Sequence, residues 1–338
     1  MLNTYNKKEM CPNCLSIMIP DIEVKKIIFE INKDNIEVEA ERAVCTNCKE
    51  EFLVKGIDDG YALAYQKYKI KNNYLLPEQI KGIREKYGMT QKQYSLLLGF
   101  GEITIHRYEN GSLQDKSHDV IMKLSKIPDN MMKMFVENKS RISTDEQTVI
   151  EKCIKQNIED YSKAMKEIKE YFNYEPNEFN GYKKFDIDRT INTILLILEN
   201  TMDAWTTQIV KYLFYLDFIT YKKLKKPFIG LEYIRDKHGP LVNNYEKILN
   251  YMVQEVYLKQ QHVNTKNHTG RKYTLISHPV HNFFSEEEIK FIDAIINKLK
   301  DKTPTELSEK THNEFDGWIL TPQGEKISYD KYADRVNI

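Results

Sequence analysis

Apolar and polar residues near the N-terminus alternate with the period of two that is typical of a half-buried β-strand. The apolar residues at alternate positions are Ile27, Phe29 and Ile31 in a first segment and Ile36, Val38 and Ala40 in a second. Residues 32–35, between these segments, are Asn, Lys, Asp and Asn, and Asn and Asp tolerate the backbone geometry of tight turns. The pattern predicts a β-hairpin whose turn lies at residues 32–35.

From residue 58 onward the apolar spacing becomes that of helices. A connector helix is predicted within residues 58–74, with one aromatic face made of Tyr61, Tyr65 and Tyr68. Three shorter helices follow, at residues 77–87, 91–98 and 102–109. Pro77 suits a first helical position and Thr90 an N-cap, and Gly88 ends the first of these helices. Because the turn at residues 99–101 contains glycine, the last two predicted helices have the plan of a helix-turn-helix.

Helical periodicity also dominates the second half of the chain. A charged segment at residues 139–185 is predicted to bridge the two halves, with a linker where Pro, Gly and Asn gather at residues 173–182. Its apolar stripe consists of Ile150, Ile154, Ile158 and Tyr161. Three further amphipathic helices are predicted after residue 186, and His238, Gly239 and Pro240 are expected to form a tight turn between elements.

Four of the five cysteines form two Cys-x-x-Cys pairs that flank the predicted hairpin. The pairs are Cys11 with Cys14 and Cys45 with Cys48. Four thiolates at this spacing are the ligands of one tetrahedral structural zinc ion, and they leave no open position for substrate. Four free cysteines are the alternative, which is disfavoured because so small an apolar core would fold poorly without a metal. Cys153 remains, in a helical setting that favours a buried structural thiol.

A mainly α, multidomain protein is therefore predicted, since 338 residues exceed what one core usually needs. The predicted parts are a zinc ribbon on a β-hairpin at residues 1–57, the connector helix at 58–74, a helix-turn-helix domain at 75–138, the helical bridge and linker at 139–185, and a mostly helical domain with minor β content at 186–338. The densest apolar run, residues 194–198, is too short to span a bilayer, and cysteines used as thiolates suit a reducing compartment. We expect a cytoplasmic protein with no membrane partner.

Charge gives little support to strong DNA affinity. Lys and Arg together number 50, as do Asp and Glu, so the chain has no net charge at pH 7. Residues 75–126 contain eight basic and six acidic residues, a net charge of +2. So small an excess provides few phosphate contacts. Two copies on a palindromic site would double those contacts, and we therefore expect a homodimer.

Residues 98–111 resemble the helix-turn-helix of phage-repressor-type regulators, through Leu98-Gly99-Phe100-Gly101-Glu102 and Arg107-Tyr108-Glu109-Asn110-Gly111. With the upstream cysteine pairs, the N-terminal half is similar to the MqsA family of antitoxin regulators. The resemblance implies that the third helix enters the major groove of double-stranded operator DNA. The residues expected to contact DNA are Gln91, Glu102, Ile103, Thr104, His106 and Arg107, with Gln91 on a phosphate.

Each of these residues also has a structural interpretation. Arg107 could be a solvated surface charge, and Glu102 could complement the positive end of a helix. The resemblance further implies that Ile105 and Tyr108 point into the core. It also implies that Arg84 and Glu109 form a pair that holds the first helix to the third.

The C-terminal half resembles the Panacea domain, also called SocA-like. The matching blocks are Lys211-Tyr212-Leu213-Phe214-Tyr215-Leu216-Asp217, then Lys237-His238-Gly239-Pro240-Leu241, then Leu307-Ser308-Glu309-Lys310-Thr311-His312 with Trp318. Such domains are associated with antitoxins that neutralise a neighbouring toxin protein. Candidate partner-binding residues are Phe214, Tyr215, Asp217, His312 and Trp318. Hydrogen-bonded structural roles are the alternative for Asp217 and His312, and core packing for the aromatic residues.

The expected function is that of a type II antitoxin, which is not an enzyme. The helix-turn-helix would repress transcription of its own operon, and the C-terminal domain would neutralise, by direct contact, a toxin encoded nearby. One alternative is a proteolytic adaptor, and another is a transcriptional regulator that neutralises no toxin. A zinc hydrolase is disfavoured because four cysteines leave no coordination site for water.

Overall fold

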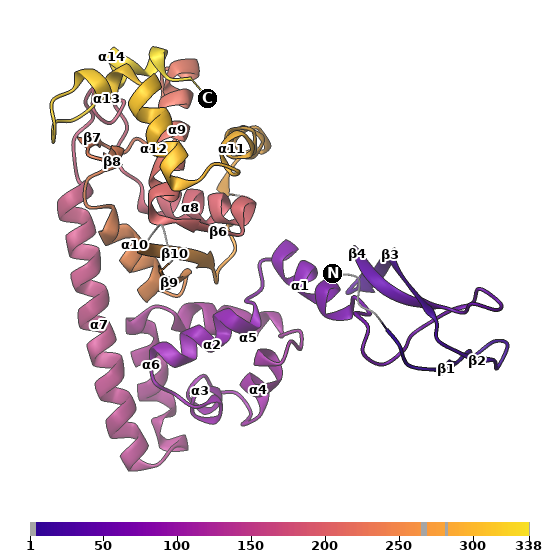
Figure 1. Cartoon of the computed structure of the whole chain (residues 1–338). Coiled ribbons are helices and arrows are strands. Elements are labelled where there is room, and N and C mark those ends of the chain that lie inside the picture. Colours follow the sequence, from indigo (N-terminus) through magenta and orange to yellow (C-terminus); the bar gives the residue numbers. More distant parts are fainter. Residues whose placement is uncertain (1–4, 265–268, 281–282, 338) are drawn as a thin grey trace.

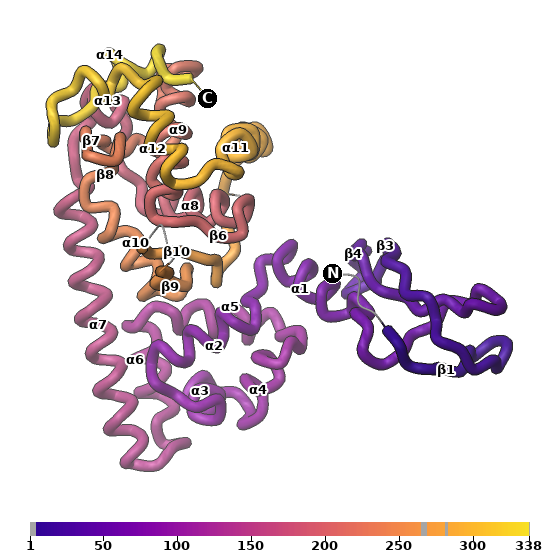
Figure 2. Tube along the Cα trace, viewed as in Figure 1, coloured from indigo at the N-terminus to yellow at the C-terminus, as the bar shows by residue number. Residues whose placement is uncertain are grey.

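The computed structural model describes residues 5–264, 269–280 and 283–337. Helices predominate, and several small sheets accompany them. Figure 1 shows an N-terminal β module, a bundle of short helices beside it and a C-terminal body, with one long helix running along the bundle and the body. The tube in Figure 2 follows the same path of the chain. Within the described residues, no helix is long and apolar enough to cross a membrane.

A long antiparallel hairpin forms the N-terminal module. Strands β3 (Asp21–Ile31) and β4 (Asp34–Val44) pair along their whole length, and β5 (Glu51–Phe52) adds a third strand. A two-stranded ribbon of β1 (Glu9–Met10) and β2 (Ile17–Met18) lies before it. Ile36, Val38 and Ala40 are buried in β4, which confirms the predicted alternation.

The turn of this hairpin is shorter than predicted. Ile31 pairs with Asp34, so only Asn32 and Lys33 form the turn, and both have positive φ, at 50° and 72°. Two-residue hairpin turns need this conformation because it matches the right-handed twist of the strands. The prediction of a turn at residues 32–35 was therefore wrong by two residues, since Asp34 already belongs to the ladder.

Helix α1 (Tyr61–Lys71) packs on the hairpin and leads into the helical bundle. Ala64 and Tyr68 are buried against Ile31, Ile36 and Val38. Gly60, before the helix, has a φ of 76°, and a Cβ there would collide with the side chain of Ala40. Glycine is therefore required at this close approach of backbone to sheet.

The bundle consists of α2 (Pro77–Lys86), α3 (Gln91–Leu97), α4 (Thr104–Glu109), α5 (Lys116–Ser125) and α6 (Pro128–Asn138). Thr90 caps α3 by accepting a hydrogen bond from the backbone of Gln93, as an N-cap does. Helix α4 begins at Thr104, two residues later than predicted, because Glu102 and Ile103 belong to the turn before it. Ile105 and Tyr108 are buried in the core of the bundle, as predicted.

Helix α7 (Thr144–Phe172) is shared by the bundle and the C-terminal body. At 29 residues and ~1.5 Å per residue it is roughly 43 Å long. Ile150 and Ile154, in its first half, are buried in the core of the bundle, whereas Ile168 and Phe172, near its end, belong to the C-terminal core. One continuous helix therefore packs against both cores.

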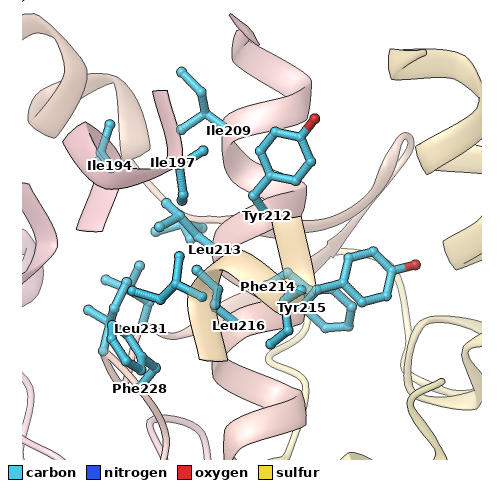
Figure 3. Packing of buried hydrophobic residues seen from close by; sticks show 14 of the residues in the cluster. Ile194, Ile197, Ile209, Tyr212, Leu213, Phe214, Tyr215, Leu216, Phe228 and Leu231 are labelled. Atoms are coloured by element: carbon cyan, nitrogen blue, oxygen red, sulfur yellow. The ribbon is translucent and has the colours of Figure 1, made fainter. Parts of the chain in front are cut away.

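The C-terminal body surrounds α9 (Thr206–Leu224), whose buried residues form the centre of the packing in Figure 3. A three-stranded sheet has the order β6-β10-β9, and β7 and β8 form a separate hairpin. Its other elements are α8 (Ile187–Thr201), β6 (Asp203–Trp205), β7 (Tyr233–Asp236), β8 (Gly239–Val242), α10 (Tyr245–Gln254), β9 (Leu258–Asn264), β10 (Thr269–Leu275), α11 (Glu286–Leu299), α12 (Pro304–Glu314), α13 (Asp316–Leu320) and α14 (Tyr329–Tyr332). Gly239 has a φ of 97° after the two-residue turn between β7 and β8.

One fully buried carboxylate organises this body. Asp217 of α9 accepts hydrogen bonds from the backbone N–H groups of residues 229, 230 and 231, at 2.5, 3.0 and 3.1 Å. The hydroxyl group of Tyr233 donates to its Oδ2 at 3.0 Å, and the hydroxyl group of Tyr329 is shared between this oxygen, at 3.2 Å, and the carbonyl of Leu231, at 2.8 Å. Burial raises the pKa of Asp217, and the three backbone donors oppose that shift. The carboxylate thus connects α9, β7, α14 and the segment at residues 229–231, which we call the strap before β7.

A second buried charge cluster joins the bundle to the C-terminal body. The ammonium of Lys86, at the end of α2, lies 2.7 Å from a carboxylate oxygen of Glu255, after α10, and both side chains are almost fully buried. The Nζ of Lys126 sits over the ring of Tyr257 at 3.2 Å from its centroid, and burial lowers the pKa of this lysine to about 7. A Cβ at Gly82 would collide with Val256. The two parts are therefore in close, dehydrated contact.

We predict that Asp217→Ala lowers the free energy of unfolding by about 3–5 kcal/mol, because it leaves buried amide and hydroxyl donors without an acceptor. Urea unfolding of the full chain measures this. Asp301→Ala is the matched control, since Asp301 is exposed and makes no hydrogen bond or ion pair with a described residue. A loss below about 1 kcal/mol for Asp217→Ala would show that the carboxylate does not organise the body.

Candidate functional site

Four cysteine sulfurs meet at the open end of the N-terminal hairpin. The Sγ atoms of Cys11 and Cys48 are 3.5 Å apart, and those of Cys14 and Cys45 are 3.6 Å apart. All four lie within 4.8 Å of one another. No described group of His, Cys, Asp or Glu elsewhere in the chain has comparable metal-ligand geometry.

The two Cys-x-x-Cys segments have the same backbone conformation. The residue after each pair, Leu15 or Lys49, has positive φ, at 61° and 63°. Each also donates its backbone N–H to the carbonyl of the first cysteine of its pair, at 3.0 Å in both segments. The backbone N–H groups of Asn47 and Cys48 point to the sulfur of Cys45 at 3.4 Å. Such N–H···S contacts support ligating sulfurs from outside the coordination shell.

These sulfurs fit a tetrahedral metal ion. A zinc–sulfur bond of ~2.3 Å gives edges of roughly 3.8 Å in a regular tetrahedron, close to the shorter distances found here. The hydroxyl of Ser16, 2.6 Å from the sulfur of Cys14, lowers the pKa of that thiol, which favours the thiolate that a metal needs. The cluster could hold a metal ion such as zinc, with four protein ligands and no position for substrate.

The residues predicted to contact DNA lie together at one end of the bundle. Glu102 and Ile103 are in the turn before α4, and Ile103 is 57% exposed. Thr104 begins the helix half-exposed, and His106 and Arg107 project from it into solvent. The Arg107 side chain makes no hydrogen bond or ion pair with any described residue. Glu102 instead forms an exposed ion pair with Lys92, at 3.0 Å.

Internal hydrogen bonds hold these helices in place. Arg84 of α2 binds Glu109 of α4 through two hydrogen bonds, of 2.6 and 3.1 Å, which confirms the predicted pair. Gln91, at the start of α3, donates to the same carboxylate at 2.6 Å, and its Oε1 is 3.1 Å from Nδ1 of His106. The side chain of Gln91 is thus directed at α4. To contact a phosphate, Gln91 would need a different rotamer or would have to use the exposed edge of its amide group.

The segment after α4 is anchored by a lysine that the sequence pattern did not single out. Lys69 of α1 is buried, and its ammonium donates to the carbonyl oxygens of Gly111 and Ser112 at 3.0 Å each. Burial lowers the pKa of Lys69 to about 8. A cavity of about 750 Å³ lies beside these groups, between α1 and the start of α2. Helix α1 therefore connects the cysteine module physically to the end of α4.

The candidate partner-binding residues divide into two groups. Phe214, Tyr215 and Asp217 are buried in the C-terminal core and present no surface to a partner, which supports the structural interpretation of these three. Figure 3 shows the two aromatic side chains packed within this core. His312 and Trp318 are partly exposed and stack on each other, with ring centroids 4.0 Å apart. Only this pair lies where a partner could reach it.

Two polar atoms near this pair lack partners. Within the described part of the chain, Nε2 of His312 and Nε of Arg235 are buried without a hydrogen bond. The guanidinium of Arg235 lies over the Trp318 ring, 4.7 Å from its centroid. Burial, and the nearby Lys211, lower the pKa of His312 and favour the neutral imidazole.

Comparison with known proteins identifies part of the C-terminal body. Residues 209–319 match the family model described as antitoxin SocA-like, Panacea domain. The match covers about a third of the chain and includes α9, the β7–β8 hairpin and α12. A comparison with curated proteins found no match. The C-terminal part of the chain therefore carries a SocA-like Panacea domain.

We expect purified protein to contain one zinc ion per chain, because the four sulfurs already form a closed tetrahedral set. Elemental analysis of the full chain measures the ratio. Cys48→Ser should lose most of the metal, whereas Cys153→Ser should retain it, since the Cys153 sulfur lies in the bundle near the carbonyl of Lys86. Metal-free protein with a folded N-terminal module, or equal metal loss in both variants, would contradict the assignment.

Proposed function

We propose that this protein is the antitoxin of a type II toxin–antitoxin system. The observation that carries the proposal is the Panacea domain at residues 209–319, because domains of this family belong to antitoxins. In this proposal the C-terminal body binds a toxin protein encoded nearby and keeps it inactive by direct contact. His312 and Trp318 are the surviving candidates for that surface, since they are the accessible members of the predicted set.

We further propose that the N-terminal half binds operator DNA and represses transcription. Helices α3 and α4 would act as a helix-turn-helix, with Thr104, His106 and Arg107 toward base edges and phosphates. Exposure of these side chains supports this role, and so does the internal Arg84–Glu109 pair that fixes α4 on α2. Zinc would serve as a structural clamp for the MqsA-like ribbon. A homodimer on a palindromic operator would compensate for the small positive charge of the bundle.

The neutralisation proposal is tested by co-expression with the product of the neighbouring open reading frame. The full chain should restore growth of cells that produce this protein. Asp301→Ala serves as a benign control, and a chain truncated after residue 140 should fail, because it lacks the Panacea domain. Rescue by residues 1–140 alone would contradict the assigned division of labour. Measuring the toxin's half-life separates a blocker, which leaves the toxin present, from a proteolytic adaptor, which shortens its life.

The DNA-binding proposal predicts that Arg107→Ala weakens binding to the upstream promoter by a factor of about 5 to about 150, from the about 1–3 kcal/mol that such a contact contributes. Electrophoretic mobility shift of the promoter fragment at fixed salt measures this. Lys152→Ala removes the same charge from α7, which lies on the other side of the bundle from α4 in Figure 1. Equal weakening by both variants would indicate general electrostatics, and no weakening by Arg107→Ala would exclude α4 as the reading helix.

A further inference from the structure

A small cavity opens where β6 runs into α9. Its volume is about 280 Å³, and its walls come from the first turn of α9, the β7–β8 turn and the start of β10. The residues that matter for its chemistry are Trp205, Thr206, Lys211, Asp236, His238 and Arg271. The Thr206 hydroxyl donates to the backbone carbonyl of Arg271 at 3.2 Å, which fixes the start of α9 against β10. His312 and Trp318 do not line the cavity, but they lie next to it, since the Trp318 indole N–H donates to the backbone carbonyl of Asp236 at 2.8 Å.

Lys211, whose ammonium group is incompletely paired, contributes to the cavity wall. Lys211 is only 2% exposed, and its Nζ donates to the carbonyl of Pro240 at 2.9 Å. Because an ammonium has three N–H donors, two remain without an acceptor among the described residues. Burial lowers the pKa of Lys211 to about 7, and the nearby Asp236 opposes this shift. A buried cation without a directly bonded counter-ion is costly, and an anion in the cavity would relieve that cost.

The backbone leaves room for this ammonium. A Cβ at Gly239 would collide with Nζ of Lys211 and with Oγ1 of Thr311. Gly239 also has positive φ, so glycine suits both the turn and the space beside the lysine. The β7–β8 turn is thus shaped around the amine and holds it at the cavity.

Two further groups make the cavity attractive to an anion. The helix dipole places partial positive charge at the start of α9, where Thr206 and Thr207 line the cavity. Arg271 lines the cavity half-exposed, and its guanidinium makes no hydrogen bond or ion pair with a described residue. Asp236 is the opposing charge, and one of its oxygens accepts the backbone N–H of His238 at 3.3 Å. Two cationic side chains and a helix terminus therefore face one carboxylate.

We propose that this cavity receives a carboxylate group, supplied by an acidic side chain of the toxin that the Panacea domain binds. The identity of that partner rests on the function proposed above. A carboxylate fits better than a phosphate, because Asp236 would repel a dianion more strongly than a single charge. Trp205 and Tyr245, both half-buried, border the cavity. Trp, Tyr and Arg are enriched in protein–protein interfaces.

The chemistry of the cavity is testable with the full chain alone. We expect sodium acetate to raise the thermal unfolding midpoint above that in sodium chloride of equal ionic strength, because acetate would bind only the folded state. Arg271→Gln should lose most of this difference and keep the midpoint in chloride. Lys290→Gln, which removes the same charge from the exposed face of α11, should retain the acetate response.

Every outcome of this experiment decides the assignment. An acetate response that is absent, or equal in wild type and Arg271→Gln, would overturn the anion site. A larger response to inorganic phosphate than to acetate would overturn the choice of carboxylate. Lys211→Met provides a second variant, and it too should lose the acetate response. If this variant fails to fold, the result for Arg271→Gln still decides whether the cavity binds an anion.

The partner is tested separately by titrating the neighbouring gene product into wild type and variants. We expect Arg271→Gln to weaken binding at least tenfold, and Lys290→Gln to bind as wild type does. Equal binding by wild type and Arg271→Gln would overturn the docking role and leave the proposed antitoxin function intact. Failure of wild type to bind would instead refute the proposed function, whatever the acetate experiment shows.

Discussion

The C-terminal body depends on the buried carboxylate of Asp217 and the five donors that surround it. A carboxylate in an apolar core is tolerated only when hydrogen bonds replace the water it has lost. Here the donors come from the strap before β7 and from Tyr233 and Tyr329, so that burial of one charge fixes several segments. Because the β7–β8 hairpin follows directly from this strap, the same network positions the turn beside Lys211.

Further contacts join the helical bundle to the C-terminal body. Helix α7 packs against both cores, and the ion pair of Lys86 with Glu255 is buried between them. A buried pair gains little net stability, since desolvation offsets the attraction, but breaking it leaves one charge unpaired. The arrangement therefore favours a fixed relation between the candidate DNA-reading helices and the Panacea domain. The cysteine module contacts the bundle through α1 and Lys69.

Local features of the sequence predicted much of this structure, and distant contacts account for what was missed. Alternation in β4, the cysteine spacing and the Arg84–Glu109 pair were evident because short-range patterns, or a known helical motif, specify them. The start of α4 and the hairpin turn were misplaced, since backbone geometry decides which residues cap an element. Lys69 and Lys86 were overlooked, and Lys211 was quoted only as part of a matching block, because their partners lie 42, 169 and 29 residues away, respectively. Asp217 was a candidate partner-binding residue in the sequence, and its burial in the structure favours the alternative, a hydrogen-bonded structural role.

The central claim is that the Panacea domain, and not the cysteine module, receives the toxin, while α4 stays free for DNA. Hydrogen–deuterium exchange of the full chain, with and without the neighbouring gene product, tests it most directly. The account predicts new protection at residues 203–211, 236–241 and 269–273, around the start of α9, and at residues 312–318, and none at residues 5–57. Protection confined to residues 5–140 would contradict it.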